Sequence, residues 1–233
     1  KAGNLFKNEL KIDEKNKNSL TGLAKAEASL GVIYSEENNY VLALQQYKIA
    51  LKIYLELDDK KSISKAYNNI GVLYKSERNL AKALEYFSKA LDIQEALKEP
   101  SVPVTLTNIG VIYFEQKQFQ KASLYYDKAL KAFSNLENFR GKALLFNYLG
   151  DLNRELKKLK VAEDYYNQSV SLSEKIEDKY VASLSLYQLG QLFYKQNQID
   201  KALPLAEKSL QYAKLIGSLE QRYHSEKLVS DIQ

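Results

Sequence analysis

The stretch Leu30-Gly31-Val32-Ile33-Tyr34 decides the fold, because the same pattern returns at a fixed interval along the chain. Close copies are Ile70-Gly71-Val72-Leu73-Tyr74 and Ile109-Gly110-Val111-Ile112-Tyr113, and weaker copies begin at Leu149 and Leu189. Consecutive glycines of these copies are 39 or 40 residues apart. A fixed period of this length is the mark of a repeat protein, in which each unit packs against its neighbours.

A second set of positions is phased with the glycines. Twelve residues after each glycine stands an alanine, and in four of the five units an aromatic residue follows four positions later. These residues are Ala43, Ala83, Ala122, Ala162 and Ala202, followed by Tyr47, Phe87, Tyr126 and Tyr166. The fifth unit breaks the pattern with Ala206, and three residues beyond the aromatic position every unit has alanine or serine.

Each unit is predicted to form two helices. In the second unit, residues 63–73 and residues 80–91 each carry apolar side chains at the spacing of one helix face. The polar stretch Ser76-Glu77-Arg78-Asn79 between them has the length of a helix–helix turn. No segment alternates with the period of a strand. We therefore predict an all-α fold, a right-handed superhelical solenoid of antiparallel helix pairs.

The glycines carry the packing argument, because five of the nine stand at one phase of a helix. Glycine inside a helix costs about 1 kcal/mol relative to alanine, so we expect the missing Cβ to let the paired helix approach closely. Gly141 and Gly217 fall in predicted linkers, where backbone freedom is the simpler reason. Pro204 predicts a kink or a delayed start in its helix, with Asp200 as cap and Lys201 as first residue.

This small–aromatic–small pattern resembles the tetratricopeptide repeat over nearly the whole chain. The usual repeat has 34 residues, and units of about 40 resemble a longer variant found in bacterial signalling and regulatory proteins. The family's first-helix tryptophan and its proline after the second helix are missing here. The resemblance implies a protein- or peptide-binding scaffold that is not an enzyme and carries no cofactor.

The period divides the chain into a single array, residues 1–233. We predict a half-repeat or N-terminal helix at 1–23 and the start of a sixth repeat or a cap at 222–233. The five full repeats between them are 24–63, 64–102, 103–142, 143–182 and 183–221. Since both ends fall within a repeat, we expect the array to continue on both sides or to end in capping helices.

Composition excludes several classes of site. The chain has no cysteine and one histidine, which rules out thiolate sites and histidine clusters. The net charge of +5 comes from lysines interleaved with carboxylates, so we expect no nucleic-acid partner for this segment. No apolar run is long enough for membrane insertion. Zero cysteine does not locate the protein; between cytoplasm and periplasm, we expect the cytoplasm.

The tetratricopeptide resemblance also implies which residues line the concave surface, through their phase relative to each glycine. The first two repeats place three lysines and an asparagine there, a patch suited to an acidic segment or a terminal carboxylate. The later repeats place aromatic residues beside hydrogen-bonding ones, as a peptide groove requires. The predicted partner-binding residues are Lys25, Lys65, Asn68, Lys75, Thr107, Phe114, Asn147, Asp151, Arg154, Tyr187, Gln191 and Tyr194.

Three functions remain open from the sequence. The first is the sensor or regulatory segment of a larger bacterial signalling protein. The second is a regulator of the peptide-pheromone-receptor type, and the third is a stand-alone adaptor. We expect a monomer or a weak dimer in each case. An enzyme would need a closed pocket with a perturbed carboxylate, and no sequence motif predicts one.

Overall fold

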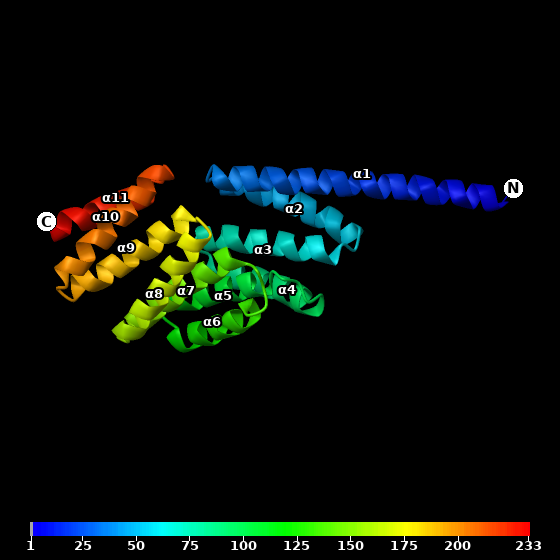
Figure 1. Cartoon of the computed structure of the whole chain (residues 1–233). Helices are drawn as coiled ribbons and strands as arrows, with labels where there is room; N and C mark the ends of the chain where they lie inside the picture. Colours follow the sequence, from blue (N-terminus) through cyan, green and yellow to red (C-terminus); the bar gives the residue numbers. More distant parts are fainter. Residues whose placement is uncertain (1) are drawn as a thin grey trace. The chain divides into compact units, whose positions relative to one another are not determined.

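The computed structural model describes the backbone of residues 2–233 and the side chains of residues 15–233. Within this part of the chain every regular element is an α-helix and no strand occurs, which confirms the predicted fold class (Figure 1). The chain divides into two compact units, Lys1–Ile112 and Tyr113–Gln233. The helices are α1 (Ala2–Glu36), α2 (Tyr40–Glu56), α3 (Lys60–Ser76), α4 (Leu80–Ala96), α5 (Val102–Glu115), α6 (Phe119–Phe133), α7 (Phe139–Glu155), α8 (Leu159–Lys175), α9 (Lys179–Lys195), α10 (Ile199–Leu215) and α11 (Leu219–Ile232).

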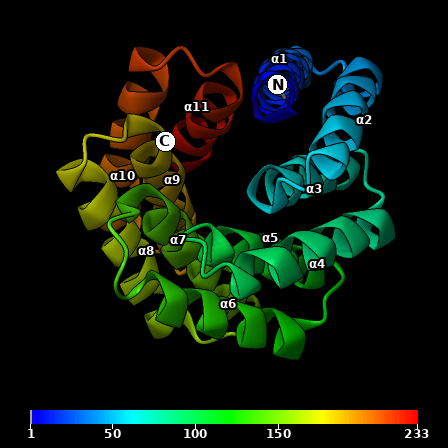
Figure 2. The ribbon, with the colours of Figure 1, turned by 90° about the vertical axis from the view of Figure 1, so that its right-hand side faces the viewer.

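Within each unit the helices pack as antiparallel neighbours joined by short turns (Figure 2). In the first unit α1 packs on α2 and α3 on α4. In the second unit α7 packs on α8, α9 on α10, and α11 on both α9 and α10. These packed pairs agree with the two helices that the period predicts for each repeat. Helix α1 runs without a break through the repeat boundary placed at residue 23.

The phased glycines make the close contact that the sequence predicts, and the contact is with the aromatic ring. A Cβ added to Gly31 would lie 2.6 Å from the Tyr47 ring, and one added to Gly150 would lie 2.4 Å from the Tyr166 ring. Gly71 faces Phe87 at 2.8 Å in the same way. The paired helices therefore approach to a distance at which only glycine fits under the ring.

The fifth repeat reaches a similar contact by a different route. Its second helix carries Ala206 where the other repeats have an aromatic residue. A Cβ added to Gly190 would meet the side chain of Leu228 at 3.3 Å and the backbone of Ala202 and Ala206 at 3.5 Å. A leucine from α11 thus lies over the glycine, and the contact is looser than in the repeats that keep their ring.

Most turns share one geometry, in which the residue after the C-cap is left-handed. Asn38, for example, has φ of 59°. The next residue, Asn39, donates its N–H to the carbonyl of Tyr34 at 2.8 Å, as in a Schellman motif. Its side chain then accepts the N–H of Leu42 and caps α2. The residues other than glycine with positive φ are Asn38, Asp58, Arg78, Lys98, Lys117, Lys157, Glu177 and Asn197.

Two predictions made for individual residues were wrong and one was confirmed. Gly141 lies inside α7 rather than in a linker, and a Cβ there would meet Phe133 and Asn138 at 2.9 Å, so close packing explains this glycine. Helix α10 begins at Ile199, so Pro204 does not delay its start, and the cap position falls two residues before Asp200. Gly217 is in a turn with φ of 68°, as predicted.

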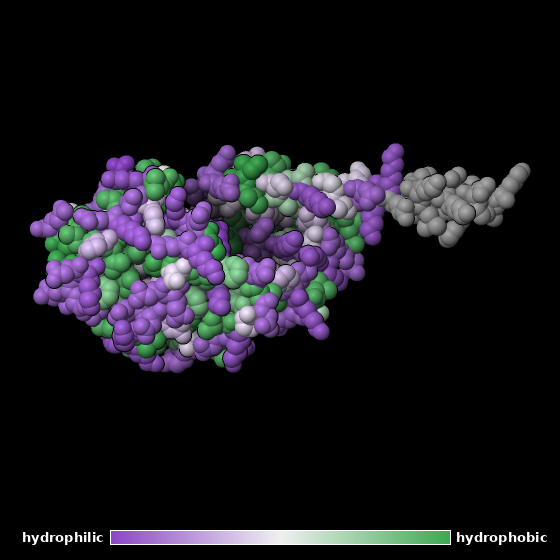
Figure 3. Space-filling model, viewed as in Figure 1, coloured by the Kyte–Doolittle hydropathy of each residue, from purple (hydrophilic) through white to green (hydrophobic). Residues whose placement is uncertain are grey.

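Among the residues that the structure describes, no helix is long and apolar enough to cross a membrane. On the face seen in Figure 3, hydrophilic side chains are spread widely and hydrophobic ones are interspersed among them.

The glycine contacts predict opposite effects for one substitution at two sites. Gly150→Ala should lower the free energy of unfolding by about 1–3 kcal/mol, because the Tyr166 ring is fully buried and cannot move aside. Gly22→Ala is the control: a Cβ there meets nothing within 4 Å, so the helix should gain up to ~1 kcal/mol. Urea unfolding measured by circular dichroism tests both, and equal effects would contradict the packing argument.

The turns predict a stabilising change to glycine. Lys98 has φ of 52°, a conformation that costs a residue with a Cβ about 1–2 kcal/mol. Lys98→Gly removes this cost and should raise the free energy of unfolding by about 0.5–1 kcal/mol, after the larger chain entropy of glycine is subtracted. Asn197→Gly is the control, because asparagine tolerates this conformation and should gain less. A loss of stability in Lys98→Gly would argue against strain in the turns.

Candidate functional site

The predicted partner-binding residues fall into two groups, which we describe unit by unit. In the first unit, Lys25 lies exposed on α1 and Lys65 exposed on α3. Lys65 borders a pocket of about 180 Å³ between these helices, with Val32 and Tyr54 also in its wall. Asn68 is turned toward α5, where its Oδ1 accepts the Thr105 hydroxyl at 3.2 Å.

Lys75 and the two residues predicted on α5 contribute less to an open surface. Lys75 is half-buried near the end of α3. Thr107 is 7% exposed, and its hydroxyl donates to the carbonyl of Pro103 at 2.7 Å, so the structure places it in the interior. Phe114 is half-buried, with its ring centroid 5.7 Å from that of Phe119.

In the second unit, a bonded set of polar side chains links three helices. Asp151 and Arg154 of α7 form an ion pair at 3.1 Å. The Tyr166 hydroxyl of α8 donates to Asp151 Oδ1 at 2.8 Å. Arg154 Nη1 donates to Gln188 Oε1 of α9 at 2.7 Å. We call Asp151, Arg154, Tyr166 and Gln188 the α7–α9 bridge.

Burial decides the electrostatics of this bridge. Burial raises the pKa of the Asp151 carboxyl above its ordinary value, although Arg154 and the Tyr166 hydroxyl favour its charged form. Burial, together with the nearby Asp151, also raises the pKa of the Tyr166 phenol. Tyr166 therefore stays protonated and acts as a hydrogen-bond donor.

Helix α9 presents the next three predicted residues along the same side of the unit. Gln191 Nε2 donates to the Tyr187 hydroxyl oxygen at 2.5 Å. The Tyr194 hydroxyl donates to the backbone carbonyl of Asp231 in α11 at 2.8 Å. The Tyr187 ring lies 5.7 Å from the imidazole of His224, centroid to centroid. These contacts fix the side chains in place before any partner binds.

Asn147 is not on the surface where the prediction put it. It is 1% exposed, and its Oδ1 has no hydrogen-bond partner. The residue stands one helical turn before Asp151 on α7. It is a buried acceptor beside the bridge rather than a contact residue of an open groove.

Two adjoining pockets lie between α9 and α11. The first, of about 240 Å³, has walls of tyrosine, glutamine, histidine and glutamate over a floor of serines; it is lined by Tyr180, Ser183, Leu184, Tyr187, Gln188, Ser209, Glu220, Gln221, His224 and Ser225. The second, also of about 240 Å³, is lined by Tyr187, Gln191, Tyr223, His224, Lys227, Leu228 and Asp231.

The α11 side of these pockets was not among the predicted residues, although the sequence carries a signal for it. Ser230 stands in register with the repeat glycines. The lining positions six before, three before and one after it are His224, Lys227 and Asp231, and all three line the second pocket. Applying the same spacing to the last half-repeat would have predicted these three residues. Gln188 was missed because its position was not among the phases considered.

No set of three or more His, Cys, Asp or Glu side chains in the described part of the chain is arranged to hold a metal ion. Asp151, a carboxyl whose pKa burial raises, is bonded to Tyr166 and Arg154. The side chains described above offer a ligand hydrogen bonds, aromatic contact and charge.

The sequence profile of the tetratricopeptide repeat matches residues 62–135 and 141–214, more than half of the chain. The chain belongs to the tetratricopeptide repeat family. This family generally serves as a non-catalytic scaffold for protein interactions. A comparison with curated protein sequences finds no significant match.

Solved structures share the tetratricopeptide fold at low sequence identity. BtubC (BKLC) from P. vanneervenii is 19% identical, with a TM-score of 0.73 over 91% of this chain and 88% of that one. The Rap conjugation gene regulator of plasmid pLS20, solved with the Phr* peptide, is 18% identical, with a TM-score of 0.78 over 91% of this chain and 59% of that one. A signal-transduction ATPase with a tetratricopeptide repeat sensor from Pyrococcus horikoshii is 16% identical, with a TM-score of 0.75 over 97% and 35%. The chain thus spans only part of the last two proteins.

The raised pKa of Asp151 predicts an unusual dependence of stability on pH. The folded protein binds the Asp151 proton more tightly than the unfolded chain does, because the pKa of this carboxyl is raised in the folded state. The residue therefore stabilises the fold below the pKa of the unfolded chain, and this stabilisation is lost as the pH rises through the raised pKa. Asp151→Asn keeps an acceptor for Tyr166 and removes the charge. The free energy of unfolding of the Asp151→Asn variant, relative to that of the native protein, should therefore increase from about pH 4 to pH 7.

The control for this measurement is Asp164→Asn, which changes an exposed carboxylate on α8. Urea unfolding of both variants across the pH series gives the comparison. An Asp151→Asn curve that stays parallel to the native curve would contradict the assigned effect of burial.

Proposed function

We propose that this chain is a scaffold that binds an extended protein or peptide segment, with no catalytic activity of its own, along the side of the second unit formed by α7, α9 and α11. The observation that carries the proposal is the set of part-buried polar and aromatic side chains on these helices. Arg154, Tyr187, Gln191 and Tyr194 all belong to it, and each is held by a hydrogen bond to a neighbour.

Such a surface suits a peptide for a physical reason. Side chains already fixed by hydrogen bonds lose little conformational freedom when a ligand binds, so more of the contact energy appears as affinity. Tyrosine and arginine are also the residue types that contribute most at binding hot spots. Two pockets of about 240 Å³ next to these residues offer space for ligand side chains.

The contacts of Asp151 fit a positioning role at this surface. Its Oδ1 accepts the Tyr166 hydroxyl at 2.8 Å and pairs with Arg154 at 3.1 Å. These contacts hold Arg154 in place and account for the burial of Asp151 without a reaction.

The finer proposal is a sensor or regulatory segment of a larger bacterial signalling protein. The similarity to the Rap regulator solved with a peptide and to an ATPase with a tetratricopeptide repeat sensor supports it. A regulator of the peptide-pheromone-receptor type and a stand-alone adaptor are the alternatives. In each case we propose a monomer or weak dimer that does not bind nucleic acid through this segment.

The reading frame on both sides of this sequence separates these alternatives. An adjoining kinase, cyclase or DNA-binding module would support the sensor. A frame that closes after a few more helices would support the adaptor.

The first unit supports a second contact, with a negatively charged ligand. Lys25 and Lys65 are exposed on α1 and α3, and Lys65 borders a pocket of about 180 Å³ between these helices. We propose that this side receives an acidic segment or a terminal carboxylate, since a lysine ammonium donates to carboxylate oxygens.

Peptide selection tests the main proposal. Peptides are selected on the full chain from a displayed library and their affinity is measured by fluorescence anisotropy. Gln191→Ala should weaken binding about 2–10-fold, the effect of one lost hydrogen bond, and Arg154→Gln should weaken it by about tenfold or more. Gln168→Ala, on the exposed side of α8, is the matched control and should leave affinity unchanged.

Circular dichroism confirms that each variant keeps its helices. Failure to select any peptide would overturn the proposal. Selected peptides that bind Gln191→Ala and Arg154→Gln as tightly as the native chain would overturn the assignment to this surface.

A further inference from the structure

The pocket between α9 and α11 that contains Gln221 and Glu220 has a floor made of three serines, and their hydroxyl protons are all engaged. Ser183 Oγ donates to the Ser209 carbonyl at 2.9 Å, and Ser209 Oγ donates to the Ser183 carbonyl at 2.8 Å. Ser209 and Ser225 are 2.8 Å apart, oxygen to oxygen. Because the Ser209 proton is used on Ser183, Ser225 must be the donor in that pair. The floor is therefore closed by buried serines and has no free hydroxyl proton.

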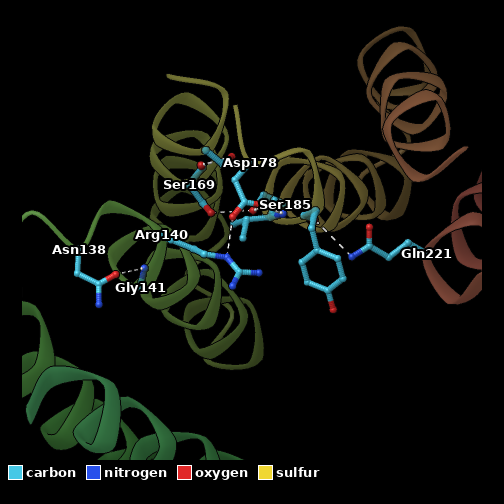
Figure 4. A network of polar contacts seen from close by, with 10 residues as sticks. Asn138, Arg140, Gly141, Ser169, Asp178, Ser185 and Gln221 are labelled. Carbon is cyan, nitrogen blue, oxygen red and sulfur yellow. Dashed lines mark hydrogen bonds and ion pairs between the residues drawn. The ribbon is translucent and has the colours of Figure 1, made fainter. Parts of the chain in front are cut away.

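Gln221 adds an acceptor that lacks a partner. Its Nε2 donates to the backbone carbonyl of Tyr180 at 3.4 Å, a contact drawn in Figure 4. A carbonyl oxygen only accepts, so the amide nitrogen must face it and Oε1 must point elsewhere. Gln221 is 8% exposed, and its Oε1 has no hydrogen-bond partner. A buried acceptor left unbonded costs about 1–3 kcal/mol, which a ligand N–H would recover.

The lining of this pocket carries one carboxylate, Glu220, and no lysine or arginine among the described residues, although the net charge of the chain is +5. Arg154, which lies beside this lining, is already bonded to Gln188 and Asp151. Glu220 and Gln221 belong to the first turn of α11, where the helix end contributes about half a positive charge. The full charge of Glu220 outweighs that partial charge.

Aromatic rings form the rest of the wall. Tyr180 and Tyr187 come from α9, and His224 comes from α11, with its ring 5.7 Å from that of Tyr187. A cation gains about 0.5–2 kcal/mol over the face of an aromatic ring, and a planar guanidinium also stacks on it. A carboxylate, an amide oxygen without a partner and aromatic faces are together what a guanidinium binds.

We infer that this pocket binds the side chain of an arginine in the peptide that the chain recognises. The inference rests on the proposed function, because it names the residue that the peptide-binding surface selects. The guanidinium would pair with Glu220 and donate to Gln221 Oε1 while its plane faces the tyrosines. Its five N–H donors match a site that supplies acceptors.

The chain provides its own reporter for a test. His224 is the only histidine, so its imidazole gives a unique pair of proton NMR signals from within the pocket. The full chain is titrated with N-acetyl-arginine amide and, separately, with N-acetyl-citrulline amide, which has nearly the same shape and no charge. Arginine amide should shift the His224 signals saturably, with a Kd in the millimolar range expected of so small a ligand. Citrulline amide should bind at least tenfold more weakly.

Variants locate the effect. Glu220→Gln keeps the size of the exposed side chain and removes the charge, and should weaken arginine amide several-fold. Glu207→Gln, on the exposed side of α10, is the matched control and should leave the titration unchanged. Equal binding of arginine and citrulline amides, no shift of His224, or an unchanged titration in Glu220→Gln would each overturn the inference.

The outcome is separable from that of the peptide selection. Selected peptides that bind along the side formed by α7, α9 and α11 but contain no arginine would support the proposed function and overturn this inference. Arginine amide binding at His224 without any selected peptide would support the pocket and overturn the proposed function.

Discussion

The contact between a helix glycine and the aromatic ring of the paired helix sets the distance on which the rest of each repeat depends. At Gly31, Gly71 and Gly150 the space under the ring is too small for a Cβ. Helices held this closely have a fixed rotation about each other, because a ring seated on one glycine cannot slide along the helix without meeting a side chain. The face that each first helix leaves uncovered is therefore determined by the same contact.

Tyr166 connects this packing to the candidate site. Its ring lies on Gly150, and its hydroxyl donates to Asp151, the next residue along α7. Asp151 holds Arg154, and Arg154 reaches Gln188 on the following repeat. The polar surface is thus held by the core residue that also spaces the helices. Arg154 could move only if the spacing between α7 and α8 changed. The close packing of Tyr166 on Gly150 prevents that change, so the polar surface of the second unit is rigid.

The sequence predicted what the period determines and failed where individual burial matters. The all-α fold, the paired helices and the close approach at the glycines follow from spacing alone, since one phase of a helix meets one neighbour. Spacing did not predict that the aromatic ring is what covers the glycine. Thr107 and Asn147 share their phase with half-buried residues of other repeats, such as Asn68 and Tyr187, but are buried here. How deeply a position lies depends on the neighbouring side chains and not on its phase alone. Gly141 and Pro204 were misplaced because helix ends depend on caps that a repeat pattern does not encode. His224 could have been predicted from its spacing to Ser230, which stands in register with the repeat glycines.

The turns have a consequence for how such a chain can change over evolutionary time. Asn39, like Asp59 and Asn79, closes the preceding helix and opens the next, so these turns have no spare residue. Inserting one residue into a helix would rotate everything after it by about 100°, one step of the helical turn, and carry a polar stripe into the interior. Natural selection should thus remove single-residue insertions and deletions almost everywhere in the array. Growth and shrinkage are left to duplication or loss of whole helix pairs, which preserve every glycine and its ring together.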